Sequence, residues 1–143
     1  MTEPVILEFE FRAGPERVFD AWTLAAEIAS WWRDPDEFAT EIWEGDLRPG
    51  GAWRVVFRGA DGGKSSASGV YREVQRPSRL SFTWKPDWDD DPPTLIAFEI
   101  APMRDGARLT LTHSGFSSEQ AREDNAGAWD GPMAMVAAHL AKD

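Results

Sequence analysis

The residue that first suggests chemistry is His113, which is followed directly by Ser114. An imidazole beside a serine resembles the arrangement by which hydrolases activate a nucleophile. Adjacent residues of a strand point to opposite faces of the sheet, so this pair cannot meet if it lies on a strand. The chain has no cysteine, and its other histidine is His139, near the C-terminus. The sequence therefore predicts no catalytic residues, and it leaves His113 either as a core histidine or as a polar group on a cavity wall.

The segment GVYREV presents a second polar candidate with two alternative orientations. If Val70 and Val74 point into the protein, Arg72 points the same way, because strand side chains alternate with period two. If Tyr71 points inward instead, Glu73 follows it. A buried carboxylate needs a partner, and Glu73 would then be a polar anchor or an acid in a pocket. The alternative is a surface glutamate paired with an arginine, and the pattern does not decide between them.

An acidic segment carries Asp87, Asp89 and Asp91 in alternation, like the first ligands of a calcium loop. Such a loop needs glycine at its sixth position and glutamate at its twelfth. This chain has Pro92 and Phe98 at those positions. The segment is therefore predicted to be a solvated acidic loop. No cluster of histidines and carboxylates suggests zinc or iron, and we expect neither a metal nor a cofactor.

The stretch EGDLRPGGAWRVVFRG holds Arg48 close to the pair Gly50 and Gly51, which together could cradle an anion. A phosphate-binding loop requires a following lysine, a serine or threonine, and a helix whose N-terminus faces the anion. Here the glycines lead into Ala52 and Trp53, at the start of an alternating strand pattern. The stretch is therefore predicted to be a turn between two strands.

The composition excludes several classes of partner. The chain has 143 residues and a formal net charge of −10, which disfavours nucleic acid and anionic membrane surfaces because both select basic proteins. The N-terminal segment has no basic, signal-like character, and no apolar run is long enough to cross a membrane. We expect a cytoplasmic protein without disulfides, folded as a single domain over residues 1–143.

Hydrophobic periodicity gives the order of the elements. Alternation predicts a strand over residues 5–11, and helical spacing predicts two short helices after it, the first beginning at Pro15 and the second capped by Thr23. Period-two patterns then predict six further strands, at residues 40–47, 52–58, 67–74, 79–84, 94–101 and 107–113. Short connections between consecutive strands indicate an antiparallel sheet with one apolar face.

The C-terminal segment is predicted to be one long helix. Ser117 with Gln120 resembles a capping box at its start, and an apolar stripe recurs at helical spacing. Pro132 interrupts the pattern and predicts a kink near Ala128. The stripe consists of Trp129, Met133, Val136 and Leu140. The sheet and this helix each have one apolar face, so each covers the other.

An ordered series of short motifs resembles a known superfamily. The motifs are VFDAWT, WW, DLRPGGAWR, GVYREV, RLSFTW and RLTLTHSGF, followed by Trp129 on the last helix, and they span nearly the whole chain. They resemble the SRPBCC superfamily, also called START-like or birch-pollen-allergen-like, and within it the homologues of the activator of the ninety-kilodalton heat-shock protein ATPase. The chain departs from the family pattern at Arg33 and at Gly131-Pro132.

The resemblance implies an α+β helix-grip fold. In this fold a curved antiparallel sheet of about six or seven strands wraps around a long C-terminal helix, with two short helices after the first strand. A curved sheet closed by one helix leaves room for a cavity. The candidate lining residues are Trp32, Trp53, Phe57, Tyr71, Glu73, Phe82, Trp84, Phe98, His113, Trp129 and Met133.

Three functions stay open at this point. The first is binding of an apolar or amphipathic small molecule between sheet and helix. The second, suggested by the family name, is interaction with a chaperone through a surface patch. The third is an enzyme of the cyclase or hydratase kind, which needs an acid and a base close together in the pocket. A homodimer through an edge strand is a further open alternative.

Overall fold

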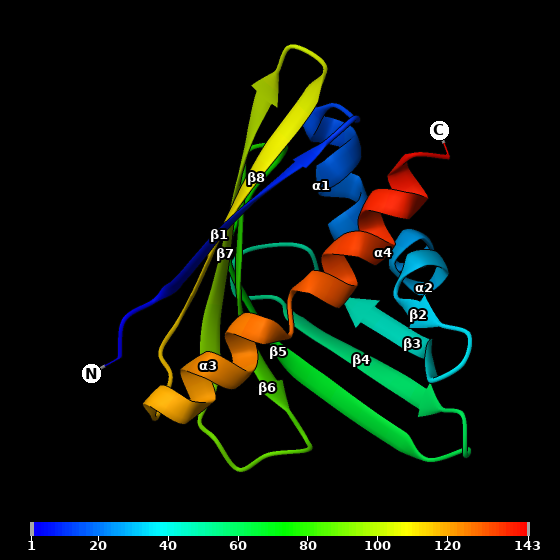
Figure 1. Cartoon of the computed structure of the whole chain (residues 1–143), viewed down its shortest axis with the longest axis vertical. Helices are drawn as coiled ribbons and strands as arrows, with labels where there is room; N and C mark the ends of the chain where they lie inside the picture. Colours follow the sequence, from blue (N-terminus) through cyan, green and yellow to red (C-terminus); the bar gives the residue numbers. More distant parts are fainter. Residues whose placement is uncertain (1, 143) are drawn as a thin grey trace.

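An eight-stranded antiparallel sheet forms the framework of the computed structural model, which describes residues 2–142. The strands follow the order β1-β8-β7-β6-β5-β4-β3-β2, and Figure 1 shows the sheet curving around the helices on one side. The strands are β1 Val5–Phe11, β2 Arg33–Asp34, β3 Phe38–Gly45, β4 Ala52–Gly59, β5 Lys64–Gln75, β6 Arg79–Pro86, β7 Thr94–Met103 and β8 Gly106–Ser114.

The inner face of the sheet follows from strand alternation. In β8, the residues Ala107, Leu109, Leu111 and His113 are all buried, and each is separated from the next by a more exposed residue. The neighbouring strand β7 buries its own alternate positions from Thr94 to Ile100. These rows share one face, so the apolar pattern predicted from the sequence is also the core-facing surface.

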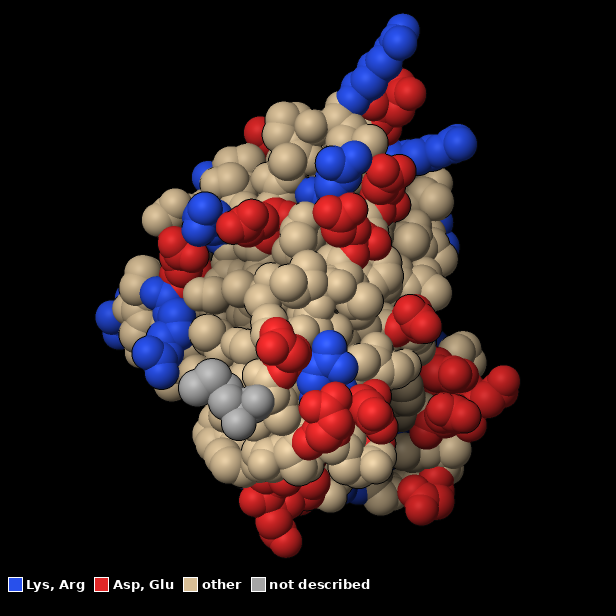
Figure 2. Space-filling model, turned by 60° about the vertical axis from the view of Figure 1, so that its left-hand side comes forward, with Lys and Arg blue, Asp and Glu red and all other residues tan. Residues whose placement is uncertain are grey.

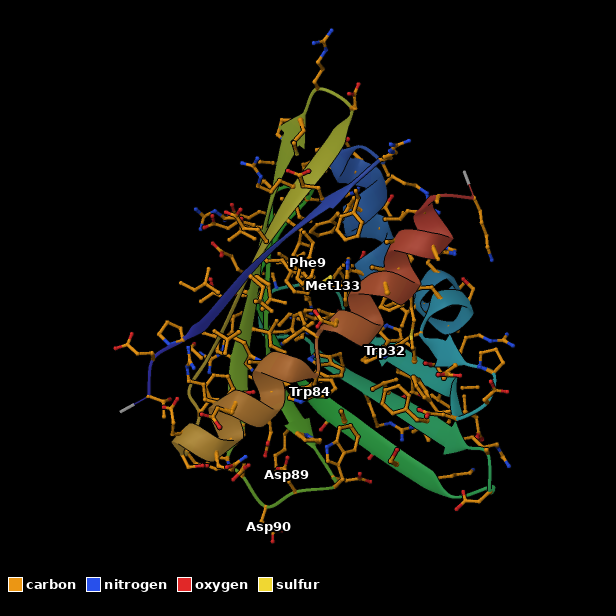
Figure 3. The ribbon with its side chains drawn as sticks, viewed as in Figure 1. Phe9, Trp32, Trp84, Asp89, Asp90 and Met133 are labelled. Atoms are coloured by element: carbon orange, nitrogen blue, oxygen red, sulfur yellow. The ribbon has the colours of Figure 1, made fainter. Side chains whose placement is uncertain are left out.

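Helices cover this inner face. They are α1 Pro15–Thr23, α2 Ala25–Trp31, α3 Glu119–Gly127 and α4 Asp130–Leu140. Figure 1 shows α1, α2 and α4 gathered on the concave side of the sheet. Met133 and Val136 of α4 are buried in the main core cluster, and Figure 3 shows Met133 between α4 and the sheet. The predicted helix-grip fold is confirmed.

The C-terminal helical segment differs from the prediction in one respect. The chain forms two helices that meet at Ala128 and Trp129, in place of one long kinked helix. Pro132 explains the break, because proline has no N–H to donate and its ring clashes with the carbonyl of the residue four positions earlier, which is Ala128. Proline is tolerated in the first turn of a helix, where α4 places it. The interruption is therefore a restart and not a kink.

Three other details of the prediction were wrong. The short strand β2 was not predicted. Ser118, not Ser117, caps α3, and its hydroxyl accepts a hydrogen bond from the N–H of Ala121 at 3.0 Å. Thr23 does not cap α2, because its hydroxyl donates back to the carbonyl of Phe19 within α1, at 2.9 Å. Serine and threonine have several local backbone partners within reach, so sequence spacing alone does not select one.

Among residues 2–142, no helix has the length and apolar character needed to cross a membrane.

Candidate functional site

An aromatic cavity of about 100 Å³ lies between the sheet and the helices. Seven of the eight tryptophans of the chain line it, and α1, α2, the strands β3 to β8 and the α3–α4 junction all contribute. The lining residues are Trp22, Ile28, Trp31, Trp32, Trp43, Trp53, Tyr71, Leu80, Phe82, Trp84, Ile96, His113, Asn125, Ala128, Trp129 and Pro132. Such a lining favours a flat, apolar occupant.

Three strands of the sheet, β3, β4 and β6, present a row of stacked rings to the cavity. The rings of Trp43 in β3 and Trp53 in β4 lie 5.4 Å apart and nearly parallel. Trp53 stacks in turn against Trp84 in β6, with ring centroids 5.7 Å apart. Trp84 then stacks on Trp32, just after α2, at 6.2 Å. Figure 3 shows Trp32 and Trp84 at the end of the interior that lies nearest the acidic loop carrying Asp89.

A β-bulge in β5 resolves the orientation of Tyr71 and Glu73. Tyr71 pairs with Phe82 and Glu73 pairs with Ser81, so the register shifts by one residue at Arg72. Such a shift breaks the strict alternation of faces. Tyr71 is therefore buried and lines the cavity.

Glu73 consequently lies outside the cavity. Its side chain is 40% exposed and its carboxylate is 3.9 Å from the guanidinium of Arg79. The prediction of Glu73 as a candidate lining residue was wrong, because the bulge turns it to the outer face. The surface pairing with an arginine, the alternative left open by the sequence, is what the structure contains.

Tyr71 brings a polar group into the apolar lining. Burial raises the pKa of its phenol to about 12, since the charged form loses its hydration. The hydroxyl therefore keeps its proton throughout the physiological pH range. Within residues 2–142 no hydrogen bond engages this hydroxyl, which lies beside Gly45. Tyr71 can therefore donate to an occupant of the cavity.

His113 is the second titratable group in the lining, and only 2% of it is exposed. Its Nε2 lies 2.7 Å from the hydroxyl oxygen of Thr94, and its Nδ1 accepts a hydrogen bond from the indole N–H of Trp129 at 3.2 Å. Burial lowers the pKa of the imidazole to about 4. His113 is therefore neutral at neutral pH, with both ring nitrogens already paired.

The indole N–H groups of the lining differ in whether they have a hydrogen-bond acceptor. Trp31 donates to the carbonyl of Ala21 at 2.7 Å, and Trp53 donates to the carbonyl of Thr83 at 3.2 Å. The indole nitrogen of Trp22 is buried too. It is the one buried side-chain polar atom without a hydrogen-bond partner in the described part of the chain. Buried donors are nearly always paired in native proteins. The indole N–H of Trp22 is therefore an exception within the described part of the chain.

The predicted lining residues divide into three groups. Those at the cavity are Trp32, Trp53, Tyr71, Phe82, Trp84, His113 and Trp129. The buried side chains of Phe57, Phe98 and Met133 belong to the core and do not line the cavity. Phe98, for example, packs edge-on against Trp22, with ring centroids 4.8 Å apart. Glu73 lies outside, as described above.

Sequence reasoning did not include several residues that line the cavity, chiefly Trp22, Trp31 and Trp43. Trp22 and Trp31 lie on apolar helix faces, where a pattern predicts burial and does not separate core from cavity wall. Trp43 lies on a strand whose alternation is disturbed by a bulge between Thr40 and Ile42. The chain has eight tryptophans, and this content is itself a sequence signal, because so much flat apolar surface suggests an aromatic-lined interior.

The glycine-rich stretch is a turn, as predicted. Gly50 adopts a φ of 85°, a conformation that favours glycine. The N–H of Gly50 donates to the carbonyl of Tyr71, and the N–H of Tyr71 donates to the carbonyl of Gly51, both at 2.8 Å. The turn between β3 and β4 thus holds the β5 backbone at the residue that enters the cavity.

The acidic loop is engaged with neighbouring residues. Asp89 lies 3.6 Å from the ammonium of Lys85, and Asp91 accepts a hydrogen bond from Ser117 at 2.9 Å. Within residues 2–142, no group of three or more histidine, cysteine, aspartate or glutamate side chains is placed to hold a metal ion. Figure 2 shows acidic side chains gathered toward the lower end of one face. With a net charge of −10, this surface disfavours the approach of anions.

Comparison with known proteins assigns the family. The model of the AHSA1 family, described as activator of Hsp90 ATPase homolog 1-like protein, matches residues 12–141. None of the curated proteins compared matches the chain.

Solved structures agree with this assignment. Protein CV1439 from Chromobacterium violaceum shares 27% identity, with a TM-score of 0.84 and coverage of 98% of both chains. The AHSA1 protein from Silicibacter pomeroyi shares 28% identity, with a TM-score of 0.81 and coverage of 97% of this chain and 98% of that one. CalU16 from Micromonospora echinospora shares the fold at 24% identity and a TM-score of 0.70, over 93% of this chain and 73% of its own. The chain therefore belongs to the AHSA1 family, a branch of the SRPBCC superfamily.

Proposed function

We propose that the protein binds a small apolar or amphipathic molecule in the cavity between the sheet and the helices. The observation that carries this proposal is the lining itself, to which seven tryptophans contribute. Aromatic side chains stabilise a core most when their rings pack against one another without gaps. A hollow kept open among so many large rings is costly unless a ligand fills it.

The size of the cavity limits the ligand. Its volume of about 100 Å³ is below that of drug-sized pockets, which hold roughly 300–1,000 Å³. An engineered apolar cavity of roughly 150 Å³ is enough to bind benzene. The occupant of the cavity in this conformation is therefore of the scale of a single aromatic ring, and a larger ligand requires side chains of the lining to move.

The hydrophobic contribution to affinity follows from this size. A single ring buries on the order of 200 Å², which at about 25 cal/mol per Å² contributes about 5 kcal/mol. That free energy corresponds to a dissociation constant on the order of 0.1–1 mM. Tighter binding would have to come from polar groups in the lining, of which the hydroxyl of Tyr71 has a donor to offer.

The test begins with the purified protein. Extraction followed by mass spectrometry is expected to release a bound small molecule, and toluene titrated into the extracted protein is expected to change the fluorescence of the cavity tryptophans. A matched pair of variants localises the site. Ile96→Phe enlarges a buried side chain of the cavity lining, whereas Leu95→Phe adds the same ring at the neighbouring, more exposed position of β7 outside it.

We expect Ile96→Phe to weaken toluene binding at least about tenfold and Leu95→Phe to leave it unchanged. A wild-type protein that carries no small molecule and binds no toluene would contradict the proposal. So would equal binding by both variants.

A chaperone partner is the alternative that the family name supports. A patch of exposed tryptophans would favour it, but Trp88, at 55%, is the one strongly exposed tryptophan in the described chain. The other exposed large apolar side chains are spread from Ile6 in β1 to Met103 at the end of β7. Co-purification with the ninety-kilodalton chaperone, abolished by Trp88→Ala, would favour this alternative over the cavity.

An enzyme of the cyclase or hydratase kind finds less support in the lining. Its titratable side chains are Tyr71 and His113, whose pKa values are shifted to about 12 and about 4. Neither group exchanges its proton readily near neutral pH, where general acid–base catalysis is most efficient with a pKa close to the working pH.

A further inference from the structure

Two hydrogen-bond donors of the cavity lining come together beside Gly45 in β3. A Cβ atom on Gly45 would lie 3.1 Å from the hydroxyl oxygen of Tyr71 and 3.3 Å from the indole nitrogen of Trp43. The next contact of that Cβ, with Trp53, would be longer, at 3.7 Å. Because glycine has no side chain, the two donors face a position that no side chain of β3 fills.

The strand register explains this arrangement. Trp43 and Gly45 are two residues apart in a regular part of β3, so they face the same side of the sheet. Gly45 pairs with Trp53 of β4, and Trp43 and Trp53 both line the cavity. The side of Gly45 that lacks a side chain is therefore the inner side. The phenol of Tyr71 reaches it from β5, two strands away in the sheet.

Both donors are unpaired and accessible. Within residues 2–142, neither the hydroxyl of Tyr71 nor the indole N–H of Trp43 has a hydrogen-bond partner. They differ from the indole nitrogen of Trp22, which has no partner and almost no accessible surface. Tyr71 as a whole is only 2% exposed, so bulk water offers its hydroxyl little hydration. A donor that lacks both water and a protein acceptor gains free energy when a ligand supplies one.

The surroundings select an uncharged acceptor. The cavity lining in the described chain includes no lysine or arginine, so a buried carboxylate or phosphate would lack a counter-charge. The carboxylates of Glu44 and Asp46 flank Gly45 in the chain, and they already pair with Arg54 and Arg48. The net charge of −10 disfavours anions further. A carbonyl oxygen is uncharged and has two lone pairs, so it can accept from two donors at once.

We propose that the ligand of the cavity is an aromatic carbonyl compound, an aryl ketone in chemical class, and that its oxygen lies against Gly45, where it accepts hydrogen bonds from the hydroxyl of Tyr71 and the indole N–H of Trp43. The inference rests on the proposed function, because it names the ligand class of the same cavity. The ring of the ligand then packs among the tryptophans of the lining.

The experiment uses two probes of the same shape. Acetophenone and α-methylstyrene differ only by an oxygen in place of a methylene group, so only the ketone accepts a hydrogen bond. Their dissociation constants are measured by titration calorimetry with the wild-type protein, Tyr71→Phe and Trp43→Phe. A substitution that merely reshapes the cavity changes both constants, whereas the loss of a donor to the oxygen changes the ketone's constant alone.

Tyr71→Phe keeps the ring and removes the hydroxyl. It is expected to weaken acetophenone binding about tenfold and to change α-methylstyrene binding less than about twofold. Trp43→Phe is expected to reduce the affinity for acetophenone, relative to that for α-methylstyrene, about fivefold.

A matched pair of glycine variants tests the position of the oxygen. Gly45→Ala keeps both donors and adds a methyl group between them, so it is expected to weaken acetophenone binding at least about tenfold. Gly131→Ala adds the same group in α4, where the space around the glycine is open, and it is expected to leave the binding of both probes unchanged.

NMR of the wild-type protein gives an independent measurement. Acetophenone should shift the indole proton of Trp43 downfield, because this proton becomes hydrogen-bonded, and α-methylstyrene should not. This measurement needs no variant, so it decides the matter even if a substituted protein does not fold.

An affinity for acetophenone that is unchanged in Tyr71→Phe or in Trp43→Phe would overturn the inference, as would the same shift of the Trp43 proton with both probes. Both results would leave the proposed cavity binding intact, because the probes would still bind. If neither probe binds to the wild-type protein, the proposed function fails, and the ligand class fails with it.

Discussion

The indole N–H of Trp129 donates a hydrogen bond to Nδ1 of His113 over 3.2 Å. Because Nδ1 accepts, the proton of the neutral imidazole lies on Nε2, which donates to the hydroxyl oxygen of Thr94 at 2.7 Å. One histidine thus joins the α3–α4 junction to β8 and β7. The chain places this polar connection in the wall of an otherwise apolar cavity, where a lost partner is costly.

The first prediction concerns the Trp129 donor. Trp129→Phe keeps an aromatic ring and removes the N–H, so Nδ1 of His113 is left buried without a partner. We expect the free energy of unfolding to fall by about 1–3 kcal/mol, as measured by urea denaturation. Trp88→Phe is the matched control, because Trp88 is 55% exposed and its replacement is expected to cost less than about 0.5 kcal/mol. Equal losses in both variants would argue against the importance of the hydrogen bond.

The second prediction is a pH dependence of stability. The pKa of His113 is lowered by burial from 6.5 to about 4, so between these values the unfolded chain binds more protons than the folded one. The free energy of unfolding therefore rises with pH between about 4 and 6.5 and gains nothing further from His113 above that window. Across this window His113 changes the free energy of unfolding by about 3 kcal/mol, because each unit of pKa difference corresponds to about 1.36 kcal/mol.

The comparison that isolates this contribution is His113→Gln. The variant has no imidazole to titrate, so its stability should change less over pH 4 to 6.5 than that of the wild-type protein. The measurement is a series of thermal or urea unfolding curves across that range. Parallel pH profiles for the two proteins would show that His113 is charged without penalty in the folded state.

The third prediction concerns the contact among three helices. Glu27 of α2 accepts a hydrogen bond from Arg17 of α1 at 2.6 Å, and its other oxygen lies 2.7 Å from Nε2 of His139 in α4. The glutamate side chain is 23% exposed. Glu27→Gln is expected to lower the free energy of unfolding by about 1–2 kcal/mol, because the carboxylate charge that Arg17 faces is lost.

Glu119→Gln provides the matched control for Glu27→Gln. Glu119 is 63% exposed and lies 3.5 Å from Arg122 in a single surface pair, so its neutralisation should cost less than about 0.5 kcal/mol. Urea denaturation of both variants at two salt concentrations tests the difference. If the two substitutions cost the same, the helix contact contributes no more than a surface pair.

The fourth prediction is that alanine has opposite effects on stability at two glycine positions. A side chain at Gly51 would overlap with the backbone carbonyl of Asp46 in the β3–β4 turn, so Gly51→Ala forces the backbone to move and is expected to cost about 2–4 kcal/mol. Gly131, in the first turn of α4, has open space around it. Gly131→Ala is expected to stabilise the protein by about 0.5–1 kcal/mol. Melting temperatures that move in the same direction for both would contradict this assignment.

Much of the fold could be predicted from the sequence because its periodicities are strong. Alternation in β8, from Ala107 to His113, identifies the core-facing side of that strand without ambiguity. Pro15 marks the start of α1 because proline suits the first turn. Pro132 was recognised as an interruption, but its consequence was not. Whether a helix bends or restarts at a proline depends on tertiary packing, which no local pattern encodes.

The candidate site could be predicted less well than the fold. Trp53 and Trp84 were found because inward-facing aromatic residues of the sheet stand out in the sequence. Glu73 was misplaced because a bulge has no reliable sequence signal and reverses which residues face inward. The special position of Trp22 depends on where neighbouring carbonyl groups lie, and hydrogen-bond partners far apart in sequence cannot be read from spacing.

The two bulges have an effect that reaches beyond the residues they displace. One lies in β3 between Thr40 and Ile42, the other in β5 between Tyr71 and Glu73, and the residues they skip, Glu41 and Arg72, are both exposed. Bulges increase local twist and bend a strand, which is how a sheet becomes concave. Deleting Glu41 and Arg72 together should flatten the sheet and close the hollow. The interior volume would thus be set from the outside, by two charged side chains that never touch a bound molecule.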